Sequence, residues 1–293
     1  MTTGDGAATP IEDIILARDH RGFTDLRSHL APDYCMEAAR FMHDRPGTAL
    51  IVTGFYEDVP HTIETDGPPG ALAIGHAWEG LGHKVVHVSD RHCVPFLTPE
   101  TGEAEVVEFP ITDPEESRAF SLSLLEKYSP SVVVAIERCS LTESGRYFNL
   151  NNPRKDISAY TARVDDLFTE HPATVGIGDG GNEIGMGKLK HIIPTMPNMA
   201  SDPAVTACTH LVICTVSNWG GYGLAAALSV VAGRDLLRSR EEEAGIVQRM
   251  VDRGSVDGSS LTRVYGVDGY TLDMNMDILD RLREAVRAHG IGG

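Results

Sequence analysis

Short apolar runs rich in β-branched residues recur along the chain and alternate with longer amphipathic segments. The runs are typical of strands and occupy residues 49–53, 84–88, 106–109, 132–136, 174–177, 211–215 and 262–267. Helical patterns occupy residues 70–81, 114–128, 159–170, 223–231, 238–251 and 276–289. Strands that alternate with helices form parallel sheets. The pattern therefore predicts a three-layer α/β fold with a mostly parallel, doubly wound (Rossmann-like) sheet.

Ahead of the first strand, apolar residues from Ile11 to about Asp44 recur at every third or fourth position, as they do on helices. We therefore expect residues 10–45 to form N-terminal helices packed on the sheet, and residues 1–9 to be a loose tail. No linker-like stretch and no internal repeat divides the chain. The sequence thus predicts one domain over residues 1–293.

Composition narrows the class of protein. The formal net charge of −17 over 293 residues disfavours nucleic acid and anionic membranes as partners, and no apolar run is long enough to span a bilayer. The five cysteines form no C-x-x-C pair, which fits a reducing compartment and argues against a zinc site. Since the first ten residues also lack the features of a secretory signal, we expect a cytoplasmic protein.

The segment TVGIGDGGNEIGMGK, residues 174–188, stands out from this background. A β-type run leads into a glycine-rich loop, and residues 176–187 contain six glycines; the loop carries Asp179, Asn182, Glu183 and Lys188. Glycines let backbone N–H groups approach a ligand closely. A strand that ends in a charged, glycine-rich turn is where open α/β sheets place their chemistry.

Polar sequences also follow the other predicted strands. They are Thr53-Gly54-Phe55 with Glu64 to Gly70, Ser89-Asp90, Glu137-Arg138, Ser217 to Tyr222, and Asp268-Gly269. Because the carboxyl ends of parallel strands meet at one edge of the sheet, one crevice should collect them. Each has a simpler interpretation: Asp66 and Ser217 as helix caps, Glu137 and Arg138 as an ion pair, and Asp268-Gly269 as a turn.

Several kinds of site are disfavoured. Residues 176–181 match the dinucleotide pattern G-x-G-x-x-G, but Asp179 would repel a pyrophosphate there. A P-loop and a G-x-S-x-G elbow are absent from the sequence. Carboxylates dominate instead, and they suit either acid–base catalysis or the binding of a hard cation.

Taken together and in this order, these motifs resemble the D-glutamate cyclase family, specifically its C-terminal cyclase-like domain. The resemblance runs from Ile11 to the last predicted helix, and residues 178–188 carry its longest motif. It implies a lyase that closes D-glutamate, a small amino-acid substrate, to 5-oxo-D-proline with reversible loss of water.

Within this reaction the motif residues take expected roles. Asp179 or Glu183 would accept the ammonium proton, and Glu137 or Asp66 would protonate the departing oxygen or hold a metal ion. The expected substrate-binding residues are Thr53, Gly67, Arg138, Gly180, Gly181, Asn182, Lys188, Ser217 and Asn218. Arg138 or Lys188 would bind the α-carboxylate, while Gly180, Gly181, Ser217 and Asn218 would donate to the oxyanion.

The cofactor and the class of protein stay open at this point. Mg²⁺ or Mn²⁺ could bind among Glu64, Asp66, Asp90 and Asp179, whereas NAD and zinc are not expected. The same carboxylates would suit a metal-dependent hydrolase of a small anionic molecule. A non-catalytic amino-acid-binding module is the third alternative. The sequence also leaves open whether the protein forms a homo-oligomer.

Overall fold

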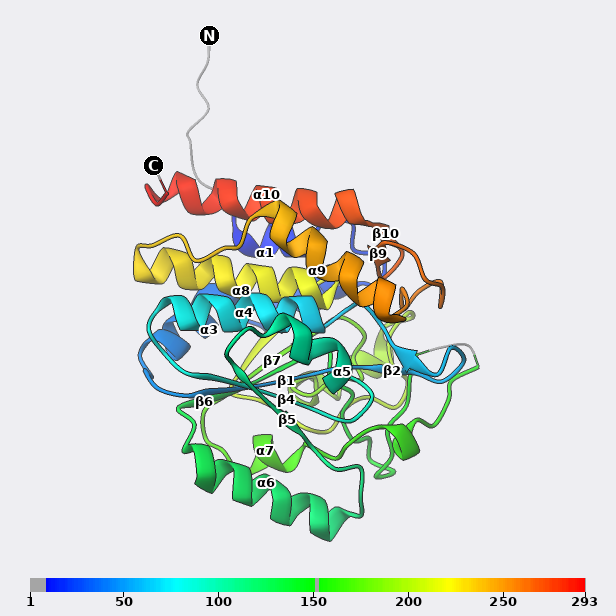
Figure 1. Cartoon of the computed structure of the whole chain (residues 1–293). Coiled ribbons are helices and arrows are strands. Elements are labelled where there is room, and N and C mark those ends of the chain that lie inside the picture. The colour runs from blue at the N-terminus through cyan, green and yellow to red at the C-terminus, as the bar shows by residue number, and fades with distance from the viewer. Residues whose placement is uncertain (1–8, 151–152, 293) are drawn as a thin grey trace.

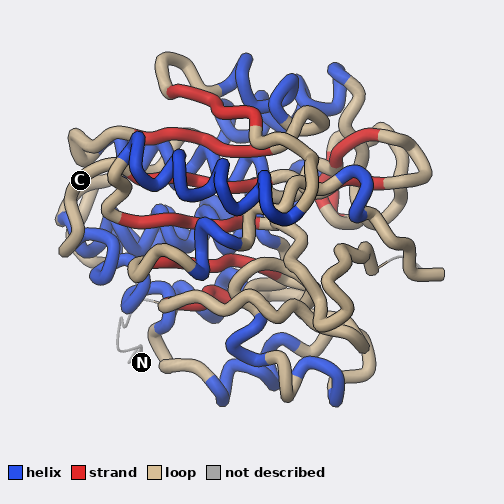
Figure 2. Tube along the Cα trace, turned by 90° about the horizontal axis from the view of Figure 1, so that it is seen from below, coloured by secondary structure: helices blue, strands red, loops and turns tan. Residues whose placement is uncertain are grey.

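A parallel sheet forms the centre of the molecule. The computed structural model describes residues 9–150 and 153–292, so the predicted tail lies outside the described residues except for its last position. The sheet has six strands in the order β5-β4-β1-β6-β7-β8. The strands run side by side through the middle of the molecule (Figures 1 and 2). They are β1 (Ala49–Thr53), β4 (Val85–Ser89), β5 (Glu105–Glu108), β6 (Val132–Ile136), β7 (Thr174–Gly178) and β8 (His210–Ile213).

The strand order places a topological switch point between β1 and β6. From β1 the chain proceeds outward to β4 and β5, then returns to β6 on the other side and continues to β7 and β8. All five neighbouring pairs are parallel. Ligands of such sheets bind beyond the carboxyl ends of the strands where the order reverses. The predicted doubly wound α/β fold is confirmed.

Helices cover both faces of this sheet (Figure 1). One face carries α1 (Ile11–Ile15), α3 (Tyr34–His43), α4 (Pro68–Gly80), α8 (Ser217–Ala232), α9 (Arg240–Arg253) and α10 (Leu272–Ala288), and the other carries α6 (Pro114–Tyr128) and α7 (Asp166–Thr169). The short helices α2 (Phe23–Leu26) and α5 (Val94–Leu97) and the hairpins β2 (Tyr56–Glu57) with β3 (Thr62–Ile63) and β9 (Gly266–Val267) with β10 (Tyr270–Thr271) lie in the connections.

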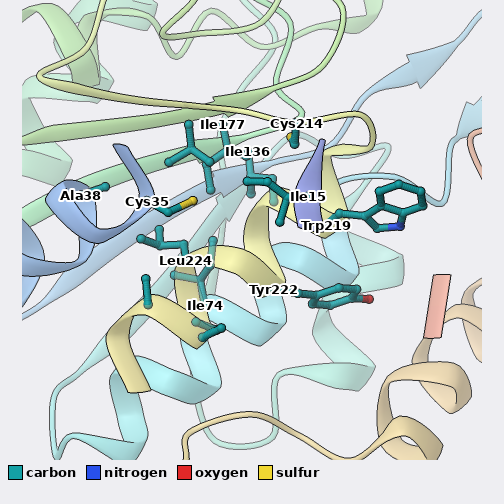
Figure 3. Close-up of a cluster of buried hydrophobic side chains, with 14 of the residues drawn as sticks. Ile15, Cys35, Ala38, Ile74, Ile136, Ile177, Cys214, Trp219, Tyr222 and Leu224 are labelled. Atoms are coloured by element: carbon teal, nitrogen blue, oxygen red, sulfur yellow. The ribbon is translucent and has the colours of Figure 1, made fainter. Parts of the chain in front are cut away.

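Successive side chains of each strand point to opposite faces of the sheet, which divides the hydrophobic core into two clusters. Ile51 and Val134 pack with the helices of the α8 face, whereas Leu50 and Val133 belong to a second cluster with residues of α6 and α7. Figure 3 shows the first cluster, in which Ile136 and Ile177 of the sheet lie near Leu224 of α8. Side chains that point alternately to opposite faces explain why these strands are apolar throughout.

Helix α8 is the central helix of its layer and contacts α4 most extensively. A Cβ atom on Gly221 would lie only 2.7 Å from the Cα atom of Gly70, so the two helices touch backbone to backbone near their N-terminal ends. Glycine at both positions permits this approach. The contact brings both helix N-termini to the crevice at the switch point.

Some elements differ from the prediction. Residues 262–267 are not a strand of the main sheet, since Gly266–Val267 pairs with Tyr270–Thr271 in a hairpin. Of residues 159–170, Asp166–Thr169 alone is α-helical. The predicted N-terminal helical region is broken into short helices, and the motif that begins at Ser217 is the first turn of α8. None of the helices in the described residues is long and apolar enough to cross a membrane.

Candidate active site

A cavity of about 320 Å³ opens at the carboxyl ends of the strands that flank the switch point. Six carboxylates line it, and every one of these residues is at least nine-tenths buried. They are Glu57, Glu64, Asp66, Glu137, Asp179 and Asp268. A space of this volume suits a small molecule. So many carboxylates in one buried space require protons, cations or a cationic ligand group to balance their charge.

Asp66 sits at the N-terminus of α8. Its Oδ2 accepts a hydrogen bond from the backbone N–H of Ser217 at 2.8 Å, and its Oδ1 accepts one from Asn218 at 2.7 Å. Asn218 in turn accepts from the N–H groups of Gly67 and Gly70 through its side-chain oxygen, which caps α4. Each helix is therefore capped by a residue from the segment that begins the other.

Burial raises the pKa of Asp66, the charge of Asp268 raises it further, and the backbone hydrogen bonds lower it, with a result of about 7. An acid with this pKa exchanges protons readily near neutral pH, as a general acid or base must.

Glu137 follows β6 directly and has a left-handed backbone, with φ of +41°. Its Oε2 accepts a hydrogen bond of 2.5 Å from the hydroxyl of Ser217. Gly67 faces it closely, since a Cβ there would lie 2.7 Å from Cβ of Glu137 and 2.8 Å from Oγ1 of Thr53. Burial, followed by the charges of Asp179 and Glu183, raises the pKa of Glu137 well above its usual value.

The glycine-rich loop after β7 is organised around Glu183. The side chain of Glu183 is fully buried, and its two oxygens accept hydrogen bonds from the N–H groups of Asp179, Gly180 and Gly181 at 2.9, 2.5 and 2.7 Å. The loop thus wraps its backbone around its own carboxylate. This arrangement holds Asp179 at the cavity, where burial raises the pKa of its carboxyl well above the usual value even though Arg21 lowers it.

Three of the carboxylates converge. One oxygen each from Asp66, Glu137 and Asp179 lies within 4.8 Å of the other two. Oxygen-only ligands at this separation fit a hard divalent cation such as Mg²⁺ or Mn²⁺, because both favour carboxylates. The same convergence also fits an acid–base pair acting on one substrate atom.

A cation, Arg21, completes the cavity wall. It comes from the loop between α1 and α2, far in sequence from the strands. Its Nη1 lies 2.8 Å from Oδ2 of Asp179, and its Nη2 lies 2.9 Å from Oδ2 of Asp268. Burial by itself lowers the pKa of Arg21, but the charges of Asp179 and Asp268 raise it more, so the guanidinium stays charged.

The family model described as "D-glutamate cyclase-like, C-terminal" matches residues 11–283 of the chain. The chain belongs to this family. The resemblance predicted from the motifs is thereby confirmed.

A curated relative has the name "D-glutamate cyclase, mitochondrial" and comes from Homo sapiens. It is 31% identical over 218 residues, which are 63% of this chain and 33% of the relative. The matched region therefore spans about a third of the relative's length.

The structure of this cyclase-like chain brings several predicted residues to the cavity and leaves their catalytic roles as predictions. Asp66, Glu137, Asp179, Asn182 and Glu64 line it. Thr53 and Gly67 lie beside Glu137. The prediction of a turn at Asp268-Gly269 is confirmed, since both residues have positive φ between β9 and β10.

Other predicted residues lie elsewhere. Arg138 is buried in an ion pair with Asp90, at 2.7 Å, and donates to backbone carbonyls of Gly54 and Ala162, so it pairs with Asp90 and not with Glu137. Lys188 donates to the carbonyl of Thr209, next to the amino end of β8. In this structure neither cation lines the cavity, which corrects the prediction that one of them binds the α-carboxylate.

The predicted oxyanion donors need the same correction. The backbone N–H groups of Gly180 and Gly181 already bond Glu183. Those of Ser217 and Asn218 already bond Asp66. Because each of these amides faces a carboxylate of the protein, it is not available to a second negative oxygen. Glu183 itself is directed at the loop backbone, so the structure gives it a structural place.

Sequence reasoning missed Arg21, Glu57 and the side chain of Asp268 as cavity residues. Arg21 lies in a region whose pattern indicated only helix packing. The Asp268-Gly269 pattern predicts a turn, which the structure contains, but it does not predict that the Asp268 side chain lines the cavity.

Proposed function

We propose that this chain catalyses the reversible cyclisation of D-glutamate to 5-oxo-D-proline with loss of water, as a carbon–oxygen lyase. The observation that carries the proposal is the cavity at the switch point, where Asp66, Glu137 and Asp179 converge, in a chain of the cyclase-like family. The substrate, its chirality and the reaction class all belong to the proposal.

Ring closure requires a neutral amine next to the side-chain carboxyl. A carboxylate whose pKa is raised is a better proton acceptor than an ordinary one, and Glu137 and Asp179 both meet this condition. In the proposed reaction one of these two takes a proton from the ammonium group. The nitrogen then attacks the side-chain carboxyl carbon, and the cavity keeps the two atoms close.

Loss of water requires a proton donor for the departing oxygen. Asp66, with a pKa of about 7, is protonated often enough near neutral pH to serve. The C–N bond forms and the C–O bond breaks, while the two protons lost by the nitrogen end on the leaving oxygen as water. Ring opening of 5-oxo-D-proline follows the same steps in reverse.

Asp66, Glu137 and Asp179 are also the residues that would hold Mg²⁺ or Mn²⁺, whereas Asp90 is committed to Arg138. A bound divalent ion would neutralise part of the cavity's negative charge and polarise a carboxyl or amide oxygen. The convergence of three carboxylates favours a second candidate as well, a metal-dependent hydrolase of a small anionic molecule.

The test is incubation of the purified protein with D- and L-glutamate and with both enantiomers of 5-oxoproline, with and without Mg²⁺ or Mn²⁺. Chiral chromatography with mass detection follows the products. We expect interconversion of the D pair, loss of activity in Glu137→Gln, and retention of activity in the exposed control Glu143→Gln. No interconversion under any metal condition would contradict the proposal.

If hydrolysis of another small anion is abolished by chelation while glutamate is inert, the second candidate replaces the first. Tight binding of an amino acid without any product would instead favour a non-catalytic binding module.

From composition alone we also propose a cytoplasmic protein with neither nucleic-acid nor membrane partners.

A further inference from the structure

Arg21 differs from the other charged residues of the cavity in sign and in origin. Among the described residues that line the cavity, it is the one cation beside six carboxylates. It comes from the N-terminal helical addition, residues 10–45, whereas Asp66, Glu137 and Asp179 follow strands of the sheet or lie in their connections. Its side chain keeps 20% of its surface exposed, so a ligand can reach it.

The loop that carries Arg21 is built to hold one position. The Oδ1 of Asp19 accepts hydrogen bonds from the backbone N–H groups of Arg21 and Gly22 at 3.0 and 2.9 Å, and its Oδ2 accepts one from Thr24. Gly22 has φ of +98°, which favours glycine. These contacts fix the backbone on both sides of Arg21.

Contacts from distant segments hold the preceding residues of the same loop. The Asn198 side chain donates to the carbonyl of His20, and the Tyr270 hydroxyl donates to the carbonyl of Arg18. Asn198 itself lines the cavity. The loop is therefore fixed to the cavity wall at several points, more than helix packing alone requires.

The contacts of the guanidinium suit an amino-acid head group. Arg21 adjoins Asp179, and Asp179 adjoins Glu137. A molecule in which a carboxylate lies next to an ammonium or amide N–H group would place its carboxylate at Arg21 and its N–H group at Asp179. The ammonium would take the place of Arg21 as the partner of Asp179 Oδ2, which releases an N–H group of Nη1 to donate to the carboxylate while Nη2 stays paired with Asp268.

We infer that Arg21 binds the α-carboxylate of the ligand, and that the N-terminal addition thereby supplies the carboxylate-recognition part of the site. The inference rests on the proposed function, because it names the part of that substrate which Arg21 recognises. It assigns to Arg21 the role that the sequence suggested for Arg138 or Lys188.

The test compares binding of 5-oxo-D-proline with binding of 2-pyrrolidinone, the same lactam without its carboxylate. Isothermal titration or ligand-detected NMR measures both affinities for the wild type, for Arg21→Gln and for Arg21→Lys. The exposed residue Arg18 of the same loop supplies a matched control, Arg18→Gln.

We expect the wild type and Arg18→Gln to bind 5-oxo-D-proline at least tenfold more tightly than 2-pyrrolidinone. Arg21→Gln should lose about 10- to 100-fold in affinity for 5-oxo-D-proline, the range of a bond between charged groups, and should leave 2-pyrrolidinone unchanged. Arg21→Lys keeps the charge that balances Asp179 and Asp268 but loses the planar fork. It should therefore fold as the wild type does and show an intermediate loss.

The inference is overturned if the folded Arg21 variants still prefer the carboxylate-bearing lactam, or if the wild type does not distinguish the two lactams. Failure of the proposed function gives a different result. If the wild type binds 5-oxo-D-proline through Arg21 but converts neither it nor D-glutamate, the cyclase proposal is wrong. The role of Arg21 in binding the carboxylate then still holds.

Discussion

Replacing Glu183 by Gln separates a structural role for this residue from a catalytic one. Glu183 accepts three backbone hydrogen bonds, two at Oε1 and one at Oε2. A glutamine keeps one accepting oxygen. In its better orientation the oxygen still accepts from Asp179 and Gly180, and the new NH₂ group faces the N–H of Gly181.

The cost can be estimated from that orientation. One bond to a charged acceptor is lost, and the N–H of Gly181 and the new NH₂ group are left facing each other as buried donors, which together cost about 2–4 kcal/mol. The charge of Glu183 raises the pKa of the neighbouring Glu137. Removing that charge relieves the repulsion between the two carboxylates and so offsets part of the loss in stability. We therefore expect the free energy of unfolding to fall by about 2 kcal/mol.

Urea denaturation measures this change, and hydrogen exchange followed by mass spectrometry should show faster exchange at residues 179–181. The control Glu143→Gln makes the same chemical change at an exposed site and should shift the free energy of unfolding by less than about 0.5 kcal/mol. If Glu183→Gln unfolds like the wild type and loses only turnover, Glu183 is an acid or base of the reaction and the structural reasoning fails.

The remaining predictions concern charge and packing. Glu137→Gln should lower kcat at least about 100-fold without lowering the free energy of unfolding, because it removes one of several like charges; a clear drop in urea stability would contradict this. Gly221→Ala should destabilise the fold by about 1–3 kcal/mol, since the new methyl meets the backbone of Gly70. Gly245→Ala on α9, which meets only the tip of Arg249, should be neutral or stabilising, and calorimetry compares the two. Because the folded pKa of Asp66 is raised to about 7, its contribution to stability is present below the unfolded pKa near 4 and is lost as pH rises toward 7. Urea titrations from pH 4 to 8 should show that decline, and Asp66→Asn should reduce its slope.

Much of the fold could be predicted because the signal is local. The apolar runs at 49–53, 132–136 and 174–177 are the central strands. Such short, continuous runs rich in β-branched residues are typical of buried strands. Residues 159–170 misled because their apolar spacing is helical, while most of the segment forms loops that pack on the second core.

The candidate site was predicted in part. Strand ends are visible in sequence, so the residues that follow β6 and β7 were found. The partners of those residues were not visible, because hydrogen bonds such as Asp66 to Ser217 join segments about 150 positions apart. Arg138 illustrates this limit. It follows a strand as expected, yet its guanidinium pairs with Asp90 and donates to the backbone carbonyls of Gly54 and Ala162.

The mutual capping of α4 and α8 has a consequence for anyone who wishes to re-engineer specificity. Asp66 and Asn218 fasten two core helices, and Asp66 also lines the cavity, so exchanging Asp66 would disturb folding and selectivity together. Libraries should instead diversify Leu150 and Ser259, which line the cavity and are exposed. New substrates would then be sought without loosening the framework that holds the reactive acids.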